Sequence, residues 1–306
     1  MSTSTVFAKS EGHWFEDGRI LAMLSAAGFS LKSIFIKLAY AGGQVDAISL
    51  LAIRMSISLP AFIWLARAGT RTNPLTRREW LALALLGLFG YYLSSLFDFM
   101  GLLYISAGLE RLILFTYPSL VVLMEAVLHR KPVGRHTLFA LVVIYCGLIA
   151  AFWHDLHQSK DTAAVITGSL WVLASSVTFS IYYLGTGRFV KQIGSTRLAG
   201  FAGAFASGYV LAHYFSQRTP TDLLAVPVNV WGWGLTLAIV STVLPIWLAA
   251  KAVSKLGAGY TATIGTLGPG MTIVLGWIIL NEPFSLLQLL GMSLVIGGVV
   301  WMGKKK

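Results

Sequence analysis

The stretch 108–132 reads GLERLILFTYPSLVVLMEAVLHRKP, and a degenerate copy of it at 259–283 reads GYTATIGTLGPGMTIVLGWIILNEP. A constant shift of 151 positions superposes four glycine or proline pairs: Gly108 on Gly259, Pro118 on Pro269, Pro132 on Pro283 and Gly147 on Gly298. Four matches in one register are informative, because single coincidences are common in apolar sequence. The chain is therefore predicted to consist of two related halves.

The repeat continues upstream of these two stretches. At a shift of 150 positions, three residues of the first half fall on identical residues of the second: Ser25 on Ser175, Phe29 on Phe179 and Ser30 on Ser180. Glycine or proline interruptions at corresponding places in two membrane halves are typical of a transporter's binding region. We therefore expect the two halves to enclose the functional site.

The composition indicates a membrane protein. Hydrophobic residues make up 56% of the 306 residues and charged residues 11%, with a mean hydropathy of +0.75. A spanning helix needs about 20 apolar residues. We predict an all-α membrane protein with ten transmembrane helices, at 19–41, 47–65, 80–104, 107–128, 136–153, 165–186, 197–215, 230–250, 258–280 and 286–301. They form two five-helix repeats, 19–153 and 165–302, after an uncleaved N-terminal segment at 1–18.

The net charge of +11 lies mainly in the connections between the predicted helices, which argues against a nucleic-acid partner. Most of the 23 Lys and Arg residues cluster at one set of helix ends, whereas only Lys160 and Arg218 lie in loops on the other side. Basic loops stay on the cytoplasmic side of a membrane, so both termini are predicted to be cytoplasmic. Five spans per half is an odd number, and the second repeat is therefore inverted relative to the first.

No pattern in the sequence indicates catalysis or cofactor binding. The single cysteine, Cys146, excludes an internal disulfide and a cysteine-based metal cluster. There is no nucleophile with an ordered His and Asp, no phosphate-binding glycine loop and no metal-ligand pair on a predicted helix. The segment 154–164, which contains His154, Asp155 and His157, is interpreted as an exposed polar loop. We expect no catalytic residues, no cofactor and no metal. The energy for any transport would come from an ion gradient or from the substrate's own gradient.

Ionisable residues inside the predicted spans belong to the first half: Lys32, Arg54, Asp98, Glu110, Arg111 and Glu125. A charge inside the bilayer costs a few kcal/mol or more and is usually paired or lines a cavity. One interpretation is that these residues form ion pairs that orient helices, and this is favoured for Glu125. The other is contact with a substrate or a coupling ion, and Glu110 and Arg111 fit the outer membrane interface as well.

We predict a central substrate cavity lined by polar and aromatic side chains of both halves: Ser25, Lys32, Tyr91, Ser95, Asp98, Arg111, Tyr117, Ser175, Tyr182 and Trp247. Lys32 would offer a positive charge to a carboxylate, while Asp98 either pairs with Lys32 or receives an amine. The aromatic residues would hold the apolar part of the substrate. Proline interrupts a helix, so hinges are predicted at Pro118 and at Gly268, Pro269 and Gly270, with a static kink as the alternative.

Three segments resemble the drug/metabolite transporter superfamily, in particular its EamA-domain branch: AGLERLILFTYPS at 107–119, AGYTATIGTLGPG at 258–270 and LNEPFS at 280–285. The resemblance covers nearly the whole chain. In that family an acidic residue commonly precedes the proline in both halves; Glu282 matches, but Lys131 stands in the first half. The resemblance implies a bacterial inner-membrane carrier, often an exporter of amino acids or other small metabolites, with a cavity formed by helices one, three, four, six, eight and nine.

The sequence thus predicts a secondary membrane transporter that works by alternating access and exports amino acids or related polar compounds. Its partners would be a small-molecule substrate and the lipid bilayer, with protons as a candidate coupling ion. Two alternatives remain: an uncoupled metabolite facilitator, and a membrane-embedded enzyme acting on a lipid intermediate. Substrate identity, direction, coupling ion and oligomeric state are left open by the sequence.

Overall fold

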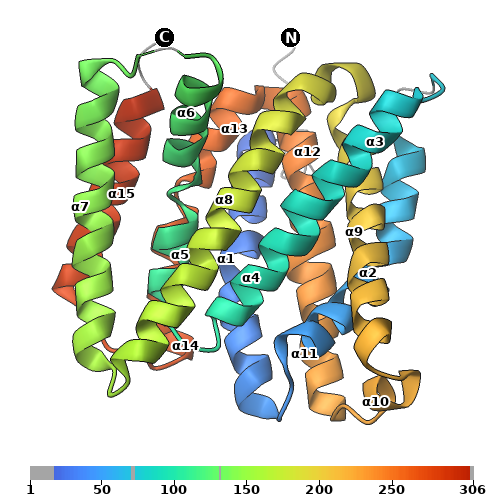
Figure 1. Cartoon of the computed structure of the whole chain (residues 1–306), viewed down its shortest axis with the longest axis horizontal. Helices are drawn as coiled ribbons and strands as arrows, with labels where there is room; N and C mark the ends of the chain where they lie inside the picture. Colours follow the sequence, from blue (N-terminus) through green and yellow to red (C-terminus); the bar gives the residue numbers. More distant parts are fainter. Residues whose placement is uncertain (1–16, 70–72, 131, 304–306) are drawn as a thin grey trace, which may run out of the picture.

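The computed structural model describes residues 17–69, 73–130 and 132–303, and every regular element in these ranges is a helix. Eight helical segments of the described residues are long and apolar enough to cross a membrane. The helices run side by side as one bundle, with the described ends of the chain near the same end of the molecule (Figure 1). Lys131 and nearly all of the segment 1–18 lie outside the described residues.

The first half begins with two long helices and then divides its third and fourth spans into shorter pieces. Its elements are α1 (Gly18–Gly42), α2 (Ala47–Ala68), α3 (Arg77–Leu86), the π-helical segment η2 (Gly87–Leu93), α4 (Ser94–Gly101), α5 (Ala107–Leu114), α6 (Tyr117–Leu128) and α7 (Arg135–Gln158). Side-chain caps start several of these helices, as where Asp17 accepts the N–H of Arg19 and Ser106 accepts the N–H of Leu109.

The second half repeats this pattern, with one added short helix. Its elements are α8 (Thr162–Ile193), α9 (Ser195–Gln217), α10 (Pro220–Leu224), α11 (Val228–Ala238), the π-helical segment η3 (Ile239–Val243), α12 (Leu244–Leu256), α13 (Ala258–Gly265), α14 (Gly268–Ile279) and α15 (Leu286–Gly303). The shift of 151 positions carries the bounds of α5 and α6 onto those of α13 and α14 without an offset. It also brings η2 onto η3, a correspondence that hydropathy did not reveal.

The helices differ from the expected ten continuous spans in three places. The helix α9 is long but rich in glycine, serine and threonine, and it packs along α2. Because its partner helix covers it, it needs fewer apolar side chains than a lipid-facing span. The span expected at 258–280 is divided into α13 and α14, as the span expected at 107–128 is divided into α5 and α6. Finally, α7 continues to Gln158 and buries Asp155, so the first part of the loop expected at 154–164 is wrong.

Helix pairs related by the repeat pack against each other at the two sides of the molecule. In Figure 1, α7 packs along α15 at one side and α2 along α9 at the other. In between, α1 contacts α12 and α14, as α8 contacts their counterparts α4 and α6. The second helices of the two halves, α2 and α9, therefore pack together, and so do the fifth helices, α7 and α15. This is the arrangement of a pseudo-twofold repeat.

The equivalent half-helices α5 and α13 have different surroundings. Seven of the eight residues of α5 are buried, and α5 packs against helices of both halves. Its counterpart α13 has no buried residue among those whose side chains are described, and it packs mainly against α1 and α12. The half-helix α5 is therefore enclosed by protein, and we call the end of the bundle that holds it the sealed end. The half-helix α13, on the side of the chain termini (Figure 1), is more exposed.

Serine hydroxyls on the long helices α1 and α8 form hydrogen bonds to backbone carbonyls beside the breaks in the divided spans. Ser30 on α1 lies 3.0 Å from the Gly268 carbonyl oxygen, and Ser180 on α8 lies 3.2 Å from that of Tyr117. These two bonds occupy equivalent positions in the repeat. Each hydroxyl also lies 2.7 Å from the carbonyl four residues earlier in its own helix. The two serines therefore join the long helices to the first residue after each break in the same way.

We expect Ser30→Ala and Ser180→Ala each to lower the free energy of unfolding by about 1 kcal/mol, because each removes the hydrogen bond that joins a long helix to the helix after the break. Thermal unfolding of the purified protein in detergent measures the effect. Ser293→Ala is the matched control, since that exposed hydroxyl donates only to the Leu289 carbonyl of its own helix. An equal loss in the control would show that the bonds across the helices contribute nothing.

Candidate functional site

A lysine and an aspartate form an ion pair at the centre of the first half. Lys32 on α1 places its Nζ 2.7 Å from Oδ2 of Asp98 on α4. Asp98 is 1% exposed and Lys32 16% exposed, so the pair is almost fully removed from solvent. A buried pair of this kind is costly to assemble, and removing one partner strands the other charge. Both residues were predicted from the sequence to line the substrate cavity, and the structure brings them together.

An arginine on α5 ties this half-helix to both halves of the protein. Nη2 of Arg111 donates to the Phe29 carbonyl at 2.6 Å and to Ser33 Oγ at 3.1 Å, both on α1. Its Nε donates to Thr272 Oγ1 on α14 at 3.2 Å. The guanidinium group can serve several acceptors at once because its five N–H donors point in fixed directions. Arg111 therefore holds α1, α5 and α14 together at the sealed end.

Glu110 is completely buried beside this arginine. Its Oε2 accepts a hydrogen bond of 2.5 Å from Ser33 and lies 3.9 Å from Arg111 Nε. The Glu110 and Asp98 carboxyls lie close enough to act on each other electrostatically. The lysine pair and the arginine network are thus one cluster, which we call the central charge cluster: Lys32, Ser33, Asp98, Glu110 and Arg111.

A second arginine lies close to this cluster. Arg54 on α2 is 3% exposed, and its Nη2 donates to Ser95 Oγ at 3.2 Å. Its guanidinium carbon lies 5.2 Å from the centre of the Phe99 ring, in a cation–π contact. Within the described ranges, Nε and Nη1 of Arg54 have no hydrogen-bond partner. Because unpaired buried donors are costly, these two atoms are available for an anionic or polar ligand.

The predicted tyrosines meet where η2 and α6 of the first half pack against α8 of the second. The hydroxyls of Tyr91 and Tyr182 are 3.4 Å apart. A Cβ on the neighbouring Gly90 would lie 2.3 Å from the Tyr182 ring, so only glycine allows this approach. Tyr117 packs edge-on against Phe179, with ring centres 5.0 Å apart. Trp247 lies apart from these rings, with the Lys251 ammonium 3.9 Å above its ring centre.

The remaining predicted residues lie at helix crossings. Ser25 donates to the Pro245 carbonyl at 2.9 Å, and Ser175 donates to the Ser94 carbonyl at 2.8 Å, again at equivalent places in the repeat. Pro118 lies in the first turn of α6 and Pro269 in the first turn of α14, each directly after the break in its span. Gly268 and Gly270 flank Pro269 in the same turn of α14. Proline fits a first helical turn, because its missing N–H would have no partner there.

Four members of this region were outside the predicted cavity lining, and one of them, Arg54, had been noted as an ionisable residue of a predicted span. Ser33 and Thr272 gave no signal, because isolated serine and threonine residues are common in apolar helices. Glu110 was noted as an ionisable residue but fitted the membrane interface equally well; the structure buries it at 0% exposure. Within the described residues, no group of three His, Cys, Asp or Glu side chains is placed to hold a metal ion.

Comparison with known proteins identifies the family. The profile of the EamA-like transporter family matches residues 17–153 and again residues 166–303. The chain belongs to this family. It is therefore a multi-pass membrane transporter with two EamA repeats.

Two relatives and one solved structure illustrate this EamA membership. The uncharacterized transporter YcbK of Bacillus subtilis is 31% identical over 93% of this chain and 91% of its own. The threonine/homoserine exporter RhtA of Escherichia coli is 27% identical over 60% of this chain and 57% of its own. A crystal structure with 18% sequence identity shares the fold, with a TM-score of 0.63 over 93% of this chain and 96% of that one.

Proposed function

We propose that this EamA transporter is a secondary carrier that exports amino acids or related polar compounds by alternating access, without enzymatic activity. In this proposal ten membrane crossings form two inverted five-helix repeats, at 19–153 and 165–302. Both termini and the segment 1–18 lie in the cytoplasm of a bacterial cell, as the distribution of Lys and Arg supports. The observation that carries the proposal is the central charge cluster, which both halves enclose.

The charge balance of this region supports a substrate that carries a carboxylate. Three cations, Lys32, Arg54 and Arg111, lie close to only two carboxyls, Asp98 and Glu110. An uncompensated cation in a membrane interior is costly unless an anion approaches it. The two free donors of Arg54 provide a place for that anion. Asp98 would bind an amine of the same substrate in place of Lys32. The tyrosines would contact the apolar part of the substrate.

The unequal burial of α5 and α13 supports alternating access. If the repeat is inverted, these equivalent half-helices belong to opposite ends of the transport path. In this proposal, the enclosed α5 and the more exposed α13 correspond to a state that faces the cytoplasm. Exchanging the environments of the two half-helices would produce the outward-facing state. The breaks before Pro118 and Pro269 would serve as the paired hinges.

Proton coupling is supported by two buried carboxyls, Asp98 and Glu110, of which Oδ1 and Oε1 have no hydrogen-bond donor among the described residues. In this proposal one carboxyl takes up a proton, and an approaching ammonium group favours its release. Exchange of a proton for the substrate's ammonium group would couple export to the proton gradient. The name of the relative RhtA, a threonine/homoserine exporter, agrees with a substrate of this kind.

Proteoliposomes loaded with amino acids, nucleosides and small amines test the proposal. We expect mass spectrometry to detect selective loss of amino acids, accelerated by an imposed proton gradient and absent from protein-free liposomes. Flux that does not respond to the gradient would instead support an uncoupled facilitator. Retention of every compound, or chemical conversion without movement across the membrane, would contradict the proposal.

A further inference from the structure

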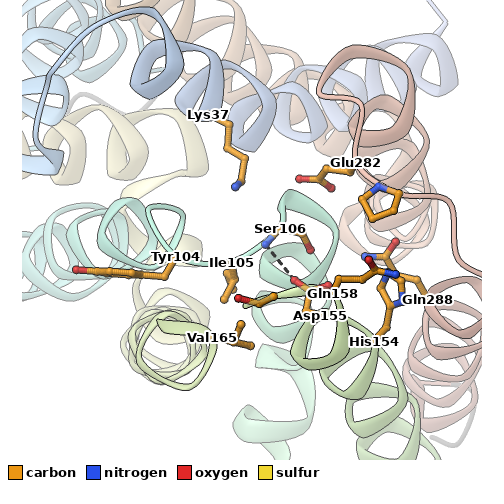
Figure 2. Close-up of a pocket in the computed structure, with 12 residues that line it drawn as sticks. Lys37, Tyr104, Ile105, Ser106, His154, Asp155, Gln158, Val165, Glu282 and Gln288 are labelled. Atoms are coloured by element: carbon orange, nitrogen blue, oxygen red, sulfur yellow. Dashed lines mark hydrogen bonds between the residues drawn. The ribbon is translucent and has the colours of Figure 1, made fainter. Parts of the chain in front are cut away.

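A polar pocket lies at the sealed end of the bundle, away from the chain termini. It has a volume of about 240 Å³ and lies between α1, the start of α5, the end of α7 and the segment before α15. Figure 2 shows the side chains of Lys37, Asp155 and Glu282 around this pocket. Ionisable groups among membrane helices are rare and costly, so three of them at one small pocket need a physical explanation.

The two acidic side chains are each held by a backbone N–H at the start of α5. Glu282 Oε1 accepts from Ala107 at 2.8 Å, and Asp155 Oδ2 accepts from Ser106 at 3.1 Å. A helix N-terminus favours negative charge, so these contacts orient both carboxyls. Burial raises the pKa of Glu282, while the N–H of Ala107 acts against that rise. A carboxylate offers about four lone-pair positions, so each group keeps acceptor capacity for a ligand.

Lys37 supplies the positive charge of the pocket. Figure 2 shows its ammonium group reaching from α1 toward the space in front of Glu282 and Ser106. In the part of the chain that the structure describes, this ammonium group makes no hydrogen bond and no ion pair within 4.0 Å. A buried lysine stem with an unpaired head in a pocket is ready to bind an anion. Carboxyls on one side and an ammonium group on the other match a ligand that carries both charges.

The pocket continues the face of α1 that belongs to the central charge cluster. Lys37 follows Ser33 by four residues, which places it one helical turn further along the same face. Glu110, the partner of Ser33, is among the charges that act on Lys37. The pocket therefore lies next to the central cluster, on the side opposite the chain termini.

We propose that this pocket is an outer binding site for zwitterionic solutes, in which Lys37 binds the carboxylate and the carboxyl groups of Glu282 and Asp155 bind the ammonium group. The inference rests on the proposed function for its role, which is to hold the exported solute before release. Binding itself can be tested without transport. Ser106 and Gln288 complete the lining with neutral hydrogen-bonding groups.

Protection of a single cysteine tests the site. Gln158 lines the pocket and is exposed, so Gln158→Cys in a Cys146→Ser background places one reactive thiol at its rim. In proteoliposomes, an equimolar pool of the standard amino acids should slow labelling by a membrane-impermeant maleimide at least about threefold. Pools of the corresponding amines without a carboxylate, and of acids without an amine, should each have a smaller effect. Equal labelling rates with and without the amino-acid pool would overturn the proposal.

Two lysine variants make the test specific. Lys37→Met should abolish protection and Lys37→Arg should restore it, whereas Lys160→Met, which removes an exposed lysine of the neighbouring loop, should leave it intact. Protection that survives Lys37→Met would also overturn the proposal. Asp98→Asn, added to the Gln158→Cys protein, separates the outer binding site from the proposed export. We expect this variant to lose transport while the amino-acid pool still protects the thiol. Transport without protection would refute the outer site alone, and protection without transport in the unsubstituted reporter would refute the proposed export alone.

Discussion

Replacing Asp98 with asparagine is expected to abolish transport and to lower the free energy of unfolding by about 3 kcal/mol. The physical reason is that Asp98 is 1% exposed and its carboxylate is the ion partner of Lys32 at 2.7 Å. Removing the carboxylate leaves a cation inside the membrane without its counter-charge. Efflux from proteoliposomes and thermal unfolding in detergent measure the two effects separately.

A double variant distinguishes a functional pair from a structural one. Lys32→Met combined with Asp98→Asn removes both charges, so most of the lost stability should return. Transport should remain absent if the pair contacts the substrate. Efflux at the natural rate from the stable double variant would show that the pair only orients α1 and α4. Asp46→Asn is the control, because Asp46 and its partner Arg218 are 40% and 41% exposed and their pair should contribute less than about 1 kcal/mol.

The second large effect is expected for Arg111→Lys. Lysine keeps the charge but lacks the fixed set of donors with which Arg111 reaches Phe29, Ser33 and Thr272. A hydrogen bond from a charged donor contributes about 1.5–3 kcal/mol. Since lysine can keep only part of this network, we expect transport to fall by about a hundredfold, which corresponds to about 2.7 kcal/mol, together with a clear loss of thermal stability.

The matched control for Arg111→Lys is Arg218→Lys. Arg218 also forms an ion pair, with Asp46 at 3.1 Å, and a hydrogen bond to Ser49, but its side chain is 41% exposed. Exposed pairs contribute little to stability, so this variant should transport and unfold like the natural chain. Comparable flux from the Arg111 and Arg218 variants would rule out the role assigned to Arg111 in joining α1, α5 and α14.

The fold class and the repeat could be predicted because both are written in local sequence patterns. Apolar stretches of sufficient length indicate membrane helices wherever they occur. The shift of 151 positions, which the sequence shows by itself, aligns α5 and α6 with α13 and α14. The number of continuous spans was less predictable. The helix α9 is covered by α2 and needs little apolar surface, and a break such as that between α13 and α14 depends on donors from other helices.

The central charge cluster was predictable only in its strongest members. Lys32, Asp98 and Arg111 were recognisable because charged residues are rare in apolar helices. Ser33 and Thr272 were not, since their importance comes from facing Arg111 across two helix interfaces. The serines chosen from the repeat, Ser25 and Ser175, hydrogen-bond backbone carbonyls at helix crossings. A sequence repeat shows that two positions are equivalent, but it does not show what either side chain contacts.

The amino-acid sequence alone determined that this chain is a duplicated, all-helical membrane protein with its interruptions at equivalent positions, because hydropathy, charge distribution and repeats are properties of neighbouring residues. Only the tertiary structure decided that Glu110 is buried beside Arg111, that Arg111 links both halves and that Glu282 caps the start of α5. It alone also decided which end of the bundle is sealed. These features depend on side chains as many as 175 positions apart meeting across packed helices, and packing of that range leaves no local pattern in the sequence.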